Sequence, residues 1–117
     1  MKPCRVWLLT AVLAPGLGWA HAFLQHAAPA VGTRVSVAPT RLRLWFSERL
    51  EAAFSRVEVV DAHGRSVAAG PLHPAADPEE LVIPLQQLTP GVYRVRWKAV
   101  SVDTHVTRGS FTFTVDR

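Results

Sequence analysis

Apolar and polar residues alternate with a period of two in three segments, and this pattern most restricts how the chain can fold. In RLRLWF, residues 41–46, the two leucines and Phe46 share one face, and the alternation recurs over residues 92–98 and 110–115. Successive side chains of a β-strand point to opposite faces, so each segment is predicted to be a half-buried strand. Trp97 falls on an apolar face and is expected to be buried.

Shorter apolar segments complete the predicted set of strands, at residues 22–25, 56–60, 66–68 and 81–83. Clusters of Pro, Gly and Asp separate them, and no window shows a capped helical period beyond a weak turn near residues 47–53. About seven strands predict an all-β fold, a small antiparallel Greek-key β-sandwich forming one domain.

The first twenty residues have the pattern of a cleavable export signal. Lys2 and Arg5 precede a short apolar run, and Gly18 and Ala20 supply the small residues read by a signal peptidase. The run is shorter than the roughly 20 residues that span a bilayer, so a retained anchor is the weaker alternative. We expect residues 1–20 to be a signal peptide, residues 21–117 to be the periplasmic domain, and the mature chain to have no membrane span.

Cleavage at this point would change the composition of the chain. It removes Cys4 and Met1, the only cysteine and methionine, which leaves no disulfide and no thiolate or thioether ligand. The mature chain keeps 11 Lys and Arg against 9 Asp and Glu, a net charge of about +2. Without a basic run, this balance argues against binding of nucleic acid.

Five cations lie on the polar faces of two predicted strands: Arg41, Arg43, Arg94, Arg96 and Lys98. They are expected to be solvated. If the two strands are neighbours, the same residues form a basic surface that could dock an acidic partner.

The segment SVDTHVTRGSF, residues 101–111, holds two candidate functional residues. Asp103 and His105 are two positions apart and would both face the core if the strand continued, where unpaired polar groups cost several kcal/mol. We therefore expect the strand to end or to bulge near Ser101, leaving both side chains at the rim of the sandwich. A metal site and a structural Asp–His hydrogen bond are both consistent with this segment alone.

His21 would be the first residue of the mature protein. It would then offer an amine and an imidazole nitrogen, which can close a chelate ring on a metal ion. His105 would add a third nitrogen and Asp103 an oxygen, and such a tetragonal set suits Cu(II). The chain also shows no nucleophile elbow, catalytic cysteine or glycine-rich phosphate loop, so we expect a protein that is not an enzyme.

With these features the chain resembles the CopC family of periplasmic copper-resistance proteins, which are cupredoxin-like or immunoglobulin-like β-sandwiches. The resemblance rests on the segments HAFLQHAAPAVGT, LRLWFSE, LTPGVYRVRWKAVSVDTH and GSFTFTV. It implies Cu(II) binding through His21, Asp103 and His105, and we expect the protein to be a monomer. It also implies a nearby carboxylate at Glu48 that orients a ligand, and a CopD-type inner-membrane partner.

The sequence departs from part of that family because it lacks a methionine-rich segment for Cu(I). His26, five residues after His21, is an auxiliary ligand, a hydrogen-bond partner or an ordinary exposed histidine. His63 and His73 fall in predicted turns and are expected to be solvated. Two other functions stay open: a copper-dependent oxidative enzyme with a histidine brace, and a metal-free secreted interaction domain.

Overall fold

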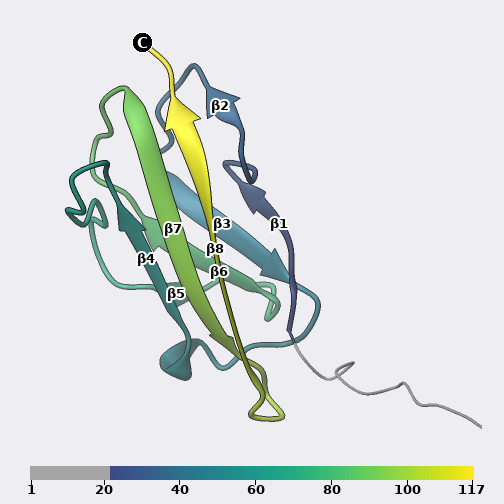
Figure 1. Ribbon diagram of the computed structural model, residues 1–117. Helices are drawn as coiled ribbons and strands as arrows, with labels where there is room; N and C mark the ends of the chain where they lie inside the picture. Colours follow the sequence, from purple (N-terminus) through teal and green to yellow (C-terminus); the bar gives the residue numbers. More distant parts are fainter. Residues whose placement is uncertain (1–21) are drawn as a thin grey trace, which may run out of the picture.

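The computed structural model describes residues 22–117 and shows eight strands in two facing sheets (Figure 1). The first sheet has the order β1-β3-β6-β5, with β1 Leu24–Ala28, β3 Arg41–Phe46, β6 Glu80–Pro84 and β5 His73–Pro74. The second has the order β2-β8-β7-β4, with β2 Arg34–Val35, β8 Val106–Val115, β7 Gly91–Val100 and β4 Arg56–Val60. The predicted all-β sandwich is confirmed. The predicted signal peptide and His21 lie outside the described residues.

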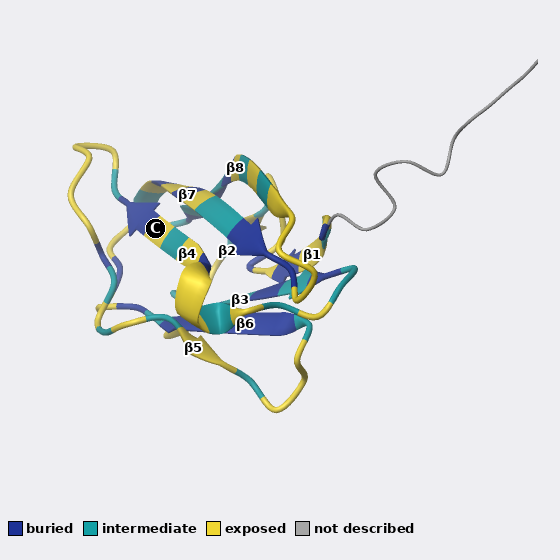
Figure 2. Ribbon diagram, turned by 90° about the horizontal axis from the view of Figure 1, so that it is seen from below, coloured by how far each residue is buried: buried dark blue, intermediate teal, exposed yellow. Residues whose placement is uncertain are grey.

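The core lies between the two sheets, where the alternation in sequence places the apolar side chains. Leu42, Leu44 and Phe46 of β3 are almost fully buried, as are Val95 of β7 and Phe113 of β8. Figure 2 shows the two layers with the buried residues along the strands. The hydrophobic effect thus selects one face of each strand, because only that face can be removed from water.

The long hairpin of β7 and β8 dominates the second sheet. Its strands pair from Gly91↔Val115 to Val100↔Val106, and residues 101–105 form the connecting loop (Figure 1). Trp97 faces inward as predicted but is only partly buried, because it lies near the end of the sandwich. Its ring covers Gly109 on β8 and packs edge-on against Phe46, with 5.2 Å between ring centroids.

Three details of the first prediction are corrected. Residues 66–68 form two isolated bridges, Val60↔Ser66 and Ala68↔Leu85, in place of a strand. The two-residue strands β2 and β5 were not predicted, because two residues are too few to show a period. β2 pairs in parallel with β8, so the sheets are not wholly antiparallel. A 3₁₀ helix, Ala52–Phe54, occurs at the end of the weak turn expected near residues 47–53.

The outward cations do not form one surface. Arg41 and Arg43 belong to β3, whereas Arg94, Arg96 and Lys98 belong to β7 in the other sheet. The two strands are therefore not neighbours, and their polar faces point away from each other across the core. Within residues 22–117, no helix is long and apolar enough to cross a membrane.

Candidate metal site

The candidate site is built on the loop between β7 and β8. β7 ends at Val100, as the cost of burying Asp103 and His105 predicted, and both of these residues are exposed. Two backbone hydrogen bonds close the loop, from Thr104 N to Ser101 O at 2.8 Å and from Ser101 N to His105 O at 3.0 Å. Thr104 has a φ of 72°, a left-handed conformation that is costly for a β-branched residue. The loop therefore holds a strained conformation between the two candidate ligand side chains.

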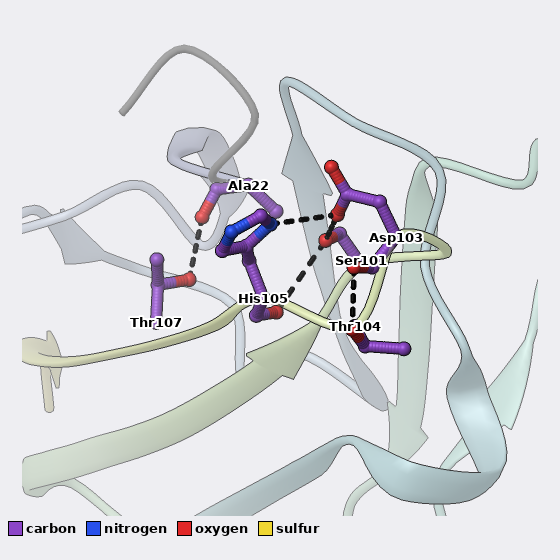
Figure 3. A network of polar contacts seen from close by, with 6 residues as sticks. All are labelled: Ala22, Ser101, Asp103, Thr104, His105 and Thr107. Carbon is purple, nitrogen blue, oxygen red and sulfur yellow. Dashed lines mark hydrogen bonds and ion pairs between the residues drawn. The ribbon is translucent and has the colours of Figure 1, made fainter. Parts of the chain in front are cut away.

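The side chains of Asp103 and His105 are in contact across this loop. His105 Nδ1 lies 3.2 Å from Asp103 Oδ1, and the two side chains are about half exposed (Figure 3). The hydroxyl of Ser101, which is fully buried, donates a hydrogen bond to the same carboxylate oxygen. The bonds from Ser101 and then from His105 lower the pKa of Asp103 below its usual value. The loop thus presents an ionised carboxylate beside an oriented imidazole.

The N-terminal segment lies beside this loop. Thr107, two residues after His105, donates a 2.6 Å hydrogen bond from its hydroxyl to the carbonyl of Ala22. Figure 3 shows the His105 ring between Ala22 and Asp103. Phe23 is held in turn by Ser47, through bonds of 2.8 Å from Phe23 N to Ser47 Oγ and 2.9 Å from Ser47 N to Phe23 O. The first described residues are therefore anchored on two sides.

Glu48 follows Ser47 and is half-buried. Its neighbour Arg49 accepts a 3.0 Å hydrogen bond at its carbonyl from Val102 N, so residues 47–49 connect the N-terminal segment with the hairpin loop. Among residues 22–117, however, no three His, Cys, Asp or Glu side chains lie close enough together to hold a metal ion. The described part of the site is the Asp103–His105 pair; Glu48 lies next to Arg49, which contacts the loop, but belongs to no such cluster.

His26 lies elsewhere, on the outer face of the first sheet. Its ring stacks on Trp45, with centroids 4.3 Å apart and an angle of 19° between planes. The Arg43 guanidinium lies 4.7 Å from the centroid of the same indole and forms a 2.6 Å ion pair with Glu80. The structure thus supplies a packing role for His26. His63 and His73 are exposed as expected, although His73 belongs to β5 and not to a turn.

Sequence reasoning missed three residues that support the site. Ser101 is buried by the same inward alternation that places Tyr93 and Val95, and this pattern could have identified it. Thr107 and Ser47 act through contacts with the N-terminal segment. Nothing local to either residue in the sequence indicates that partner.

Comparison with known proteins agrees with this architecture. Residues 24–116 match the family model described as the CopC domain. The chain is 38% identical over 110 residues to the protein YobA of Escherichia coli K12, covering 92% of this chain and 88% of that one.

Two solved structures are similar throughout the sandwich. CopC from Methylosinus trichosporium OB3b superposes with a TM-score of 0.76 at 33% identity, covering 82% of this chain and 94% of that one. PcoC, a methionine-rich copper resistance protein from Escherichia coli, gives a TM-score of 0.74 at 37% identity and covers 83% and 100%. With a matching family model over most of its length, relatives in sequence and the same fold, this chain belongs to the CopC family.

Proposed function

We propose that the mature protein is a periplasmic Cu(II)-binding protein whose metal site comprises the amine and ring of His21, the carboxylate of Asp103 and the ring of His105. The observation that carries the proposal is the hydrogen bond between Thr107 and Ala22, which brings the chain directly after His21 beside the Asp103–His105 pair. Copper resistance in the family, represented by PcoC, supports copper as the ion. The family consists of copper-resistance proteins rather than enzymes.

Covalent geometry supports His21 as the missing ligand. Consecutive Cα atoms are about 3.8 Å apart, and Ala22, the residue that follows His21 in the sequence, is held by Thr107, two residues beyond His105. The pair in the loop supplies two donors, and neighbouring donors on one ion, each about 2 Å from the metal, lie about 3 Å apart. The 3.2 Å between His105 Nδ1 and Asp103 Oδ1 is consistent with such a spacing.

The donor types support Cu(II) over Cu(I). Nitrogen and carboxylate oxygen suit the divalent ion, whereas Cu(I) prefers thiolate and thioether sulfur. The sequence contains one cysteine and one methionine, Cys4 and Met1, and both precede the proposed cleavage site after Ala20. We therefore propose that the protein sequesters Cu(II) or delivers it to a membrane partner of the CopD type. Glu48, in the segment between the N-terminal residues and the loop, would orient a ligand.

The experiment compares two forms of the protein that differ by one residue. The mature chain begins at His21, and the second form carries an additional alanine before it. An amide nitrogen is a poor ligand compared with a free amine, so the extended form should bind Cu(II) at least about tenfold more weakly by competition titration. The matched control adds the alanine after Arg117 and should bind like the mature chain. Equal affinity for the mature and N-terminally extended forms would refute a terminal-histidine site.

A further inference from the structure

The outer face of the second sheet carries a row of three cations. Arg56 of β4 pairs in register with Lys98 of β7, which pairs with Arg108 of β8. Residues directly opposite on antiparallel strands have Cα atoms about 4.5–5.5 Å apart, and like charges at these positions destabilise a sheet. The row therefore costs stability in the isolated protein.

Within the part of the chain that the structure describes, no member of this row forms a salt bridge with a carboxylate. The ion pairs between Arg or Lys and a carboxylate among residues 22–117 are Arg34–Asp116, Arg43–Glu80 and Arg96–Glu58. None involves a member of the row. Arg94 and Arg96 lie on the same outer face of the sheet as this row. Five of the 11 Lys and Arg side chains after residue 20 therefore share this face, together with Glu58.

A cavity of about 440 Å³ borders this row. Its lining includes the three cations of the row, Arg96 and Glu58, together with Ser55, Val57, Leu72 and Trp97. Arg56, Arg96 and Arg108 are exposed, and Lys98 is half-buried. Charged side chains therefore line one part of a depression that a narrow projecting segment can enter, and Val57, Leu72 and Trp97 line an apolar part.

We propose that this basic hollow docks an acidic segment of a partner protein. Guanidinium groups bind carboxylates through paired, planar hydrogen bonds, and arginine supplies most of the charge. A concave surface fits a projecting loop or chain end better than a flat bilayer, which favours a protein partner over an anionic membrane. Charge complementarity of this kind fixes orientation and accelerates association.

The position of the hollow determines what the partner would face. Lys98 lies two residues before the end of β7, and Arg108 lies three residues after His105. A strand rises about 3.3 Å per residue, so the row is about 10 Å from the hairpin loop. A segment docked in the hollow would place the partner beside Asp103 and His105. The docking itself does not depend on metal binding.

The test uses the protein from His21 to Arg117 and a fluorescently labelled peptide of ten glutamates, with a ten-glutamine peptide as the uncharged control. The triple variant Arg56→Gln, Lys98→Gln and Arg108→Gln should bind the acidic peptide at least about tenfold more weakly at low salt. The matched control, Arg41→Gln, Arg65→Gln and Arg117→Gln, loses the same charge elsewhere and should change affinity less than about threefold. Amide chemical shifts should move on β4, β7 and β8.

Equal losses in the two triple variants would overturn the proposal, because net charge alone would then explain binding. Absence of measurable peptide binding would also overturn it. Binding to phosphatidylglycerol vesicles that exceeds peptide binding and requires the same row would assign the face to a membrane instead. The hollow variant should unfold at an equal or higher temperature than the parent protein, since like-charge repulsion is relieved, and should bind Cu(II) unchanged.

Discussion

The hydroxyl of Thr107 and the carbonyl of Ala22 form a 2.6 Å hydrogen bond between residues 85 positions apart in the chain. Thr107 is two residues beyond His105, at the start of β8. This contact joins the N-terminal segment to the strand that follows the candidate site. It is therefore the structural basis for expecting a terminal residue and a hairpin loop to share one metal ion.

Thr107→Val keeps the size of the side chain and removes the donor. The lost hydrogen bond is worth about 0.5–1.5 kcal/mol, so Cu(II) affinity of the mature protein should fall about two- to tenfold as the N-terminal segment loosens. Competition titration measures the affinity. Thr107→Ser, which retains the hydroxyl, should bind like the parent protein, and an equal loss in both variants would contradict this role.

Asp103→Ala and His105→Ala should each weaken Cu(II) binding by at least about tenfold, since each removes one proposed donor atom. Both residues are exposed, so the metal-free variants should stay folded. Asp103→Ala should lower the unfolding temperature more than His105→Ala, because it removes the acceptor of the buried Ser101 hydroxyl. His73→Ala removes an exposed histidine from β5 and serves as the control. If both loop variants bind Cu(II) as tightly as the parent protein, the Asp103–His105 pair has only a structural role.

Cu(II) affinity should fall steeply as the pH decreases from about 8 to 5. Terminal amines and imidazoles ordinarily take up protons near pH 8 and 6.5, and each proton competes with the metal. Asp103 does not contribute to this decrease, because hydrogen bonds from Ser101 and His105 lower its pKa. When folding lowers the pKa of a carboxylate, the charged group stabilises the fold at pH values above its ordinary pKa near 4. This stabilisation is lost as the pH falls through the lowered pKa.

The measurement for this prediction is the copper-induced rise in unfolding temperature at several pH values, since bound metal stabilises the folded state by mass action. The rise should shrink between about pH 8 and 5. A rise that stays constant across the window would exclude a site built from an amine and two imidazoles.

Gly109→Ala should destabilise the fold by about 1–3 kcal/mol, a typical cost of overpacking. A Cβ atom at Gly109 would lie 2.7 Å from Cε2 of Trp97, which forces the indole away from its edge-on contact with Phe46. Urea unfolding followed by tryptophan fluorescence measures the change. Ser110→Ala, at the next and outward-facing position of β8, should alter stability by less than about 0.5 kcal/mol. Equal stability of Gly109→Ala and the parent protein would contradict this packing.

The local sequence determined the longer strands and their inward faces. An alternation with a period of two is recognisable within six residues. Leu42, Leu44 and Phe46 could therefore be assigned to the core before any neighbouring strand was known. The same reasoning placed Asp103 and His105 outside the strand, because burying them unpaired would cost more than ending it. The prediction was less accurate for Trp97, whose exposure depends on how far the opposing sheet extends over it.

Only the tertiary structure decided which residues meet across the chain. The sequence placed Arg43 and Arg96 alike on polar faces, but strand order puts them on opposite sides of the molecule and aligns Arg56, Lys98 and Arg108 instead. The anchoring of Ala22 by Thr107 was likewise absent from the local pattern. Periodicity is a property of neighbours in sequence, whereas register and long-range hydrogen bonds arise when the two sheets pack and bury one common core.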